Sequence, residues 1–353
     1  MFVCHAPRVI AGSVSFRSRW VVALLLVLLA GLAAWGWHAW RRNKLVVYCA
    51  HDAIFADGVL RAFEKQTGIK VAVRYDTEAT KSLGLIELLV REAAAPRCDV
   101  FWNNEVLGTV DLQRRGLLEA YRGTGFARIP SAFKDSGGYW AGFAARLRVI
   151  IRRAGEKPAG LETQPPHLPV GLHRWAIAKP LYGTTLTHYA ALWQIMGSEQ
   201  LISWHRRWRE GGGREVNGNS AVKDAVARGV CDFGFTDTDD FFSAKDEHAA
   251  VEIEPARLPN GKTICIPNTV AVLRGARHQG AARQLVDFLL SAETELALAR
   301  SKSRQIPLGA FEEADVPAEV RALRAWAADS IAVSELSAAR EECLAWLKSE
   351  SLR

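Results

Sequence analysis

Short apolar segments rich in β-branched residues alternate with segments of helical periodicity, and this alternation constrains the fold more than any other feature of the chain. The first predicted strands are residues 45–50 (LVVYCA), 69–75 (IKVAVRY) and 98–102 (CDVFW). The helices predicted with them are residues 53–67, 82–95 and 106–115. Strands that alternate with helices usually pair in parallel, so this region predicts a doubly wound α/β sheet.

A second alternating series follows a proline-rich loop at residues 158–169. Its predicted strands are residues 175–178 and 232–236, and its predicted helices are residues 183–196, 203–209, 220–228 and 279–290. Extended segments near residues 143–150 and 264–270 join the two series. We therefore expect two α/β lobes connected by a hinge, with residues 45–143 and 266–353 in lobe 1 and residues 144–265 in lobe 2.

Polar residues follow most of the predicted strands or open the predicted helices. In open α/β sheets, ligands bind at the carboxyl ends of the strands, where loops and helix N-termini meet. The candidate binding residues are His51, Asp52, Thr77, Glu78, Asn104, Glu105, Tyr182, Gly183, Thr184, Thr185, Asn219 and Ser220. The helix starts among them offer backbone N–H groups and hydroxyls that suit an oxyanion.

Asp237, Asp239 and Asp240 follow the apolar run at residues 231–235. Carboxylates this close repel one another and are costly to desolvate unless a cation or hydrogen-bond donors stabilise them. They are the candidate metal ligands, and carboxylates favour hard cations such as ferric iron, calcium, magnesium or manganese. The alternatives are a solvated acidic turn, ordinary N-capping at the helix starts, a hydrogen-bonded loop histidine at His51 and a first-turn helix acid at Glu105.

The charge of the chain argues against nucleic acid as a partner. The formal net charge is +7, but residues 1–44 hold six basic residues and no acidic one, which leaves the remainder nearly neutral. Nucleic-acid binding requires a basic patch within a folded domain. The six cysteines show no CxxC spacing, and we expect them to be core residues.

An uncharged apolar run, WVVALLLVLLAGLAAWGW, occupies residues 20–37 between pairs of arginines. Its length suits a membrane span, and the tryptophans at its ends suit the membrane interfaces. We expect residues 1–19 to be a cytoplasmic basic segment and residues 20–40 to be an uncleaved transmembrane signal anchor. The alternative is a cleaved signal peptide, which usually has a shorter apolar region.

From residue 45 to about residue 308, the chain resembles the periplasmic solute-binding proteins of ABC importers, specifically the ferric iron-binding type. The resembling stretches are residues 63–71 (FEKQTGIKV), 98–105 (CDVFWNNE), 114–118 (RRGLL), 142–151 (GFAARLRVII), 178–188 (AKPLYGTTLTH), 216–227 (VNGNSAVKDAVA) and 267–290. The resemblance implies a type II periplasmic-binding fold that closes on its ligand and catalyses no reaction.

The resemblance also assigns roles to individual residues. The metal-binding histidine of the family falls at His51 or Asp52, its glutamate at Asn104 or Glu105, and its adjacent tyrosine pair at Asp239 and Asp240. The loops that hold a small anion fall at Tyr182, Gly183, Thr184 and Asn219, and Asp237 lies near a position where the family can have asparagine. The tyrosine pair is absent, which removes the strongest ferric-selective ligands.

The resemblance implies a monomeric, extracytoplasmic receptor tethered to the inner membrane, with an ABC permease as its partner and no cofactor. The expected ligand is ferric iron or another hard metal with a synergistic anion. The first alternative is a sugar phosphate or a phosphonate, because aspartates can accept hydrogen bonds from hydroxyl or ammonium groups. The alternative of another class is a metal-dependent glycosyltransferase that uses Asp237 and Asp239 as a DxD pair. A membrane-tethered sensor is a third possibility.

Overall fold

The computed structural model describes residues 44–76, 83–155 and 174–351. The described residues from Leu45 onward form one compact unit. The predicted anchor at residues 20–40, together with Thr77 and Glu78, lies outside the described residues. Within the described ranges, no helix is both long and apolar enough to cross a membrane.

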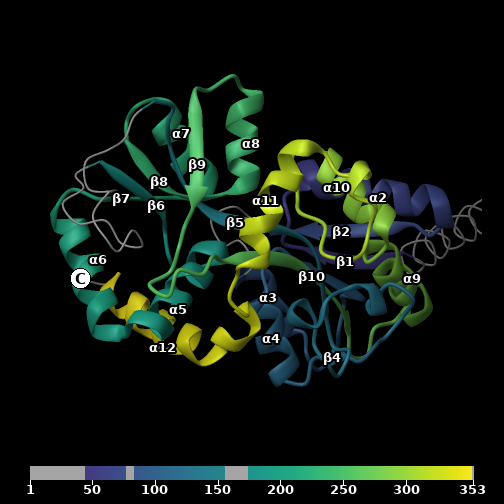
Figure 1. Ribbon diagram of the computed structural model, residues 1–353. Helices are drawn as coiled ribbons and strands as arrows, with labels where there is room; N and C mark the ends of the chain where they lie inside the picture. Colours follow the sequence, from purple (N-terminus) through teal and green to yellow (C-terminus); the bar gives the residue numbers. More distant parts are fainter. Residues whose placement is uncertain (1–43, 77–82, 156–173, 352–353) are drawn as a thin grey trace, which may run out of the picture. The chain divides into compact units, whose positions relative to one another are not determined.

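Ten strands of the described chain form a sheet in the order β2-β1-β3-β10-β5-β8-β6-β7, with β4 added on β10 and β9 added on β5 (Figure 1). The strands are β1 Leu45–Cys49, β2 Val71–Tyr75, β3 Val100–Asn103, β4 Leu118–Glu119, β5 Ala141–Arg153, β6 Trp175–Ala178, β7 Arg214–Val216, β8 Phe233–Asp237, β9 Val251–Pro255 and β10 Cys265–Leu273. We call β1 to β4 with β10 the first half of the sheet, and β6 to β9 the second half.

Strand β5 belongs to both halves. It pairs with β10 from Ala141 to Leu147 and with β8 from Arg148 to Arg152. The strand is buried from Ala141 to Ile151. It therefore passes directly from one half of the sheet into the other.

The parallel pairing expected of the alternating strands is confirmed, but each half of the sheet also contains antiparallel pairs. Strands β1, β2 and β3 pair in parallel, as do β6, β7 and β8. Strand β10, however, runs antiparallel to β3 and β5, and β5 runs antiparallel to β8. The extended segments expected to act as connectors are these two central strands, so each half is a mixed sheet.

Helices cover the sheet, and their buried faces follow the periodicity of the sequence. In α2, the buried residues are Ala56, Val59, Leu60 and Phe63, and Gly68 ends the helix with a left-handed φ of 73°. The helices are α2 Ala53–Thr67, α3 Leu83–Arg91, α4 Leu107–Arg114, α5 Gly183–Met196, α6 Ser198–Glu210, α7 Asn219–Ala227, α8 Thr238–Asp246, α9 Gln279–Leu289, α10 Ala292–Arg300, α11 Ala318–Ala328 and α12 Ser337–Glu350. The cysteines of the described residues are buried, as expected for core residues.

The C-terminal helix α12 packs on α5 and α6 of the second half (Figure 1). The indole of Trp193 on α5 donates a hydrogen bond to Glu342 at 3.0 Å, and Arg206 on α6 forms an ion pair with Glu350 at 2.8 Å. The predicted lobe 1 includes this helix. Its packing brings the end of the chain back to the second half of the sheet.

Candidate functional site

A cavity of about 330 Å³ lies where the two halves of the sheet meet. Its first-half wall consists of Asp52, Ala53, Ile54, Phe55 and Asn104. Its second-half wall consists of Ala178, Lys179, Tyr182, Gly183, Thr184, Thr185, Gly218, Asn219, Ser220, Asp237, Asp239, Asp240 and Ser243, and Arg146 lines the cavity from β5. Eleven of the predicted site residues are thus brought together. Their role in binding a ligand stays a prediction.

Four helices begin at this cavity. The first turns of α2, α5, α7 and α8 all contribute lining residues. The N-cap residues of these helices, Asp52, Tyr182, Gly218 and Asp237, make no side-chain capping hydrogen bond. Helix N-termini carry a partial positive charge and unpaired N–H groups. The cavity therefore attracts negatively charged groups from four directions.

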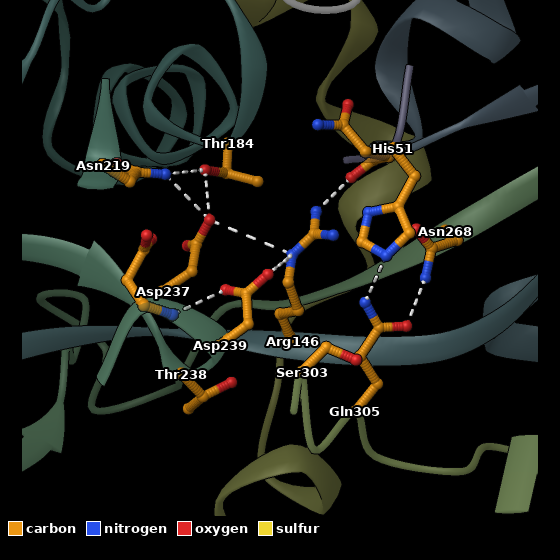
Figure 2. Close-up of polar contacts among 12 residues, drawn as sticks. His51, Arg146, Thr184, Asn219, Asp237, Thr238, Asp239, Asn268, Ser303 and Gln305 are labelled. Atoms are coloured by element: carbon orange, nitrogen blue, oxygen red, sulfur yellow. Dashed lines mark hydrogen bonds and ion pairs between the residues drawn. The ribbon is translucent and has the colours of Figure 1, made fainter. Parts of the chain in front are cut away.

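One such group is part of the chain. The Asp237 carboxylate accepts hydrogen bonds from Arg148 Nη1 at 2.8 Å, Thr184 Oγ1 at 2.6 Å and Asn219 Nδ2 at 2.9 Å. Figure 2 shows Thr184 and Asn219 converging on the same carboxylate oxygen. Arg148 is wholly buried and donates further bonds from Nη1 to the side-chain oxygens of Thr184 and Asn219. Asp237 is therefore held in a closed polar cluster, which we call the Asp237 cluster (Arg148, Thr184, Asn219 and Asp237).

Asp239 is in a different electrostatic situation. Burial raises the pKa of its carboxyl well above the ordinary value, the Arg146 guanidinium lowers it, and the carboxylates of Asp240, Asp237 and Asp52 raise it further. Arg146 Nε lies 3.7 Å from Asp239 Oδ2 (Figure 2), and this nitrogen has no hydrogen-bond partner among the described residues. Desolvation is thus only partly offset, and the carboxylate lacks the strong donors that Asp237 has.

Asp240 completes the acidic group. Its carboxylate accepts hydrogen bonds from Ser220 Oγ and Thr236 Oγ1, both at 2.9 Å. Asp237, Asp239 and Asp240 each contribute one carboxylate oxygen to a group of three, and these three oxygens lie within 4.8 Å of one another. Such a spacing suits a hard cation in their midst, because carboxylate oxygens are its preferred protein ligands. The structure therefore brings together the three predicted metal ligands.

Two predicted ligands are engaged elsewhere. His51 is buried, its Nε2 lies 2.9 Å from Gln305 Nε2 (Figure 2), and its ring stacks on Phe55 of the first-half wall. The Glu105 carboxylate accepts hydrogen bonds from the backbone N–H groups of Leu107 at 2.6 Å and Gly108 at 2.7 Å. It caps the start of α4, the alternative role of a helix acid. Neither residue lines the 330 Å³ cavity.

Arginines of β5 are functional candidates that the sequence reasoning missed. Arg146 and Arg148 are 2% and 0% exposed, and both face Asp237, in accord with the two-residue period of a strand. Arg146 also donates a hydrogen bond to the backbone oxygen of Asn104, which links the two walls. The sequence signal that could have identified them is the presence of two arginines in the otherwise apolar run ARLRVII. A buried arginine almost always has a partner.

Comparisons with known proteins agree with this architecture. The family model described as "Bacterial extracellular solute-binding protein" matches residues 45–301. A Fe(3+)-binding periplasmic protein of Serratia marcescens is 28% identical over 197 residues, which are 54% of this chain and 55% of that protein. The chain thus matches only about half the length of this curated relative.

Solved structures resemble the fold over nearly their whole length. The ferric binding protein from Campylobacter jejuni has a TM-score of 0.77 and 18% identity, and the similarity covers 87% of this chain and 99% of that one. The periplasmic binding protein AfuA from Actinobacillus pleuropneumoniae, solved with fructose-6-phosphate, has a TM-score of 0.69 and 19% identity over 88% and 99%. These similarities confirm the predicted α/β periplasmic-binding fold.

Proposed function

Since the chain belongs to the bacterial extracellular solute-binding proteins, we propose that it is the receptor of an ABC importer and binds a hard cation, ferric iron foremost, in its 330 Å³ cavity. Members of this family transport solutes and are not enzymes. The glycosyltransferase alternative is therefore set aside.

The acidic excess of the cavity carries this proposal. Among the described residues that line it, four aspartates stand against one arginine and one lysine. Asp239 is buried, and its carboxyl has a raised pKa. Its Oδ2 atom lies 3.7 Å from Arg146 Nε, which is too far for a hydrogen bond. A cation bound there would relieve the repulsion among the carboxylates and offset the cost of their desolvation.

The residues present fit a hard cation. Asp239 and Asp240 would supply oxygen ligands from the second-half wall, and Asp52 would supply one from the first-half wall. A cation held by both walls binds the closed arrangement more tightly than the open one, and this difference in affinity drives closure. The all-carboxylate set lacks phenolates, so divalent manganese, calcium and magnesium belong in the same trial as ferric iron.

A phosphorylated, hydroxyl-bearing solute is the second candidate. The four helix N-termini, Arg146 and Lys179 favour a phosphoryl group, and the aspartates can accept hydrogen bonds from hydroxyls. The volume of the cavity also exceeds the needs of a bare ion. AfuA, which has the same fold, was solved with fructose-6-phosphate.

The location of the receptor is part of the proposal. Residues 20–40 would anchor the chain in the inner membrane with the folded body outside the cytoplasm, beside an ABC permease. A tethered receptor works as a monomer because the permease, rather than a second copy, is its partner. Its anchor would keep it at high local concentration near that permease.

Native mass spectrometry of the full-length chain, released from detergent, tests the ligand class directly. Retention of one metal ion, with tight binding of Mn²⁺ or ferric citrate in calorimetry, is the expected result. Retention of an organic phosphate, with tight binding of fructose-6-phosphate and no metal, would replace the first candidate with the second. Binding of neither, together with turnover of a nucleotide sugar, would reject the receptor function.

A further inference from the structure

The Asp237 cluster places a carboxylate of the chain where an oxyanion would otherwise bind. Asp237 is the N-cap of α8, Asn219 is the first residue of α7, and Thr184 is the second residue of α5. Three helix N-termini therefore converge on one carboxylate. Helix N-termini with nearby hydroxyl and amide donors form the usual binding site for a small oxyanion. Here, the side-chain donors of that site already bind the Asp237 carboxylate of the chain itself.

Arg148 explains why a negative charge is required at this point. Its side chain is wholly buried, and Nη1 is bound to Asp237, Thr184 and Asn219. Its Nε and Nη2 atoms are also buried, and the part of the chain that the structure describes offers them no hydrogen-bond partner. Burying a guanidinium away from water is costly unless a carboxylate or another anion offsets the lost hydration. The nearest carboxylate oxygen that the described residues offer is Asp237 Oδ1, at 2.8 Å.

We infer that Asp237 is a built-in anion that determines the specificity of the site. It neutralises Arg148, saturates the side chains of Thr184 and Asn219, and keeps a free oxyanion from those donors. A ligand must then bring any negative group to the backbone N–H groups and Arg146. A metal ion would bind without a separate small anion on Thr184 and Asn219. This inference deepens the proposed function, but it does not depend on which ligand is bound.

Removal of the carboxylate provides the test. Asp237→Ala deletes one carbon and two oxygens, the heavy atoms of formate, and leaves Arg148 buried without its counter-ion. We expect 100 mM sodium formate to raise the thermal unfolding midpoint of full-length D237A by about 2–4 °C over equimolar sodium chloride. Formate would refill the vacated position. It should not shift the midpoint of the unmodified chain, whose position is filled.

Two matched variants separate this effect from general stabilisation by salt. Asp246→Ala removes another arginine-paired aspartate of α8, but its partner Arg304 is partly exposed and also pairs with Glu319. D246A should therefore show no formate response. The double variant R148M/D237A removes the buried cation and should lose the response of D237A. An equal response in all three variants would overturn the inference.

Crystals of the unmodified chain grown in 200 mM phosphate give a second, independent test. We expect the Asp237 carboxylate to remain on Arg148, Thr184 and Asn219, with no phosphate bound to those side chains. A phosphate that displaces Asp237 would overturn the inference, and this result decides the matter if D237A does not fold in either buffer. Failure of the proposed function is distinguishable, because neither test uses the transported ligand.

Discussion

The two walls of the cavity differ in how far they are assembled before a ligand arrives. The second-half wall is held by the Asp237 cluster, in which a buried arginine, a carboxylate, a hydroxyl and an amide satisfy one another. The first-half wall offers Asp52 and Asn104 beside Ile54, which is 73% exposed. The second-half wall is thus fixed by contacts within the chain, whereas Ile54 of the first-half wall presents most of its side chain to solvent.

The largest expected effect comes from breaking the order of the second-half wall. Arg148→Met leaves the buried Asp237 with only the more distant Arg146, 3.9 Å away, and should lower the free energy of unfolding by about 3–5 kcal/mol. Urea denaturation followed by tryptophan fluorescence measures this loss. Arg115→Met removes an exposed pair with Asp111 and should cost less than about 1 kcal/mol. Similar losses of unfolding free energy in the two variants would mean that the buried Arg148–Asp237 pair stabilises the fold no more than an exposed pair does.

Binding should depend next on Asp239. Asp239→Ala removes the least satisfied carboxylate of the cavity and should weaken binding of Mn²⁺ or ferric citrate about 100-fold, or ~2.7 kcal/mol, in calorimetry. Glu313→Ala, at an exposed position away from the cavity, is the control and should leave affinity unchanged. If both variants bind alike, the acidic start of α8 is not the metal site.

The raised pKa of Asp239 has a predictable sign in the empty receptor. Its carboxyl holds a proton more tightly in the folded than in the unfolded state, so the folded state loses stability as pH rises above the ordinary pKa of about 3.8. Asp239→Asn mimics the protonated form and should remove this decline. Unfolding midpoints of the two proteins without ligand, measured from pH 4 to pH 8, should diverge as pH rises. Parallel profiles would contradict the assignment.

A smaller effect should follow from the polar part of the first-half wall. Asp52→Asn keeps the size of the side chain, and Asp52 makes no side-chain capping bond to α2, so the helix should persist. Loss of one charge from the closing wall should weaken Mn²⁺ binding about tenfold, or ~1.4 kcal/mol. Small-angle scattering with Mn²⁺ should also show less compaction. Unchanged affinity would mean that the first-half wall does not touch the cation.

The smallest effect belongs to Ile54. Because its side chain is 73% exposed, Ile54→Ala should change the free energy of unfolding by less than about 0.5 kcal/mol. Its matched partner is Leu60→Ala on the buried face of the same helix, which should cost about 2–5 kcal/mol. Urea denaturation compares the two. A large loss in I54A would show that the first-half wall is already packed before the ligand binds.

Local sequence patterns predicted most helices and strands well, but they could not predict how the strands pair. The helices expected at residues 53–67 and 183–196 match α2 and α5, because apolar spacing and glycine mark their ends. Helix α6 begins at Ser198, earlier than the expected residue 203. The direction of β10 depends on contacts with β3 and β5, which no local window contains. The short strands β4, β7 and β9 were missed for the same reason.

The sequence predicted where the site lies better than it predicted which side chains contact one another there. Loops after parallel strands meet at one edge of a sheet, so the sequence could place Thr184, Asn219 and Asp237 together. It could not reveal that Arg148 binds all three, since that contact depends on the register of β5 against β8. His51 and Glu105 occupy the predicted loops, but their polar atoms are satisfied by neighbouring parts of the chain.

The place of β10 in the sheet has a consequence for biosynthesis. This strand lies between β3 and β5, although about 160 residues of chain separate Thr269 from its hydrogen-bonded partner Thr109. The first half of the sheet cannot close until Leu273 has emerged from the ribosome. Contacts this distant in sequence slow folding. The first half of the sheet in a nascent chain therefore stays open until β10 is made, and an open sheet is easier to thread through a translocation channel than a closed one.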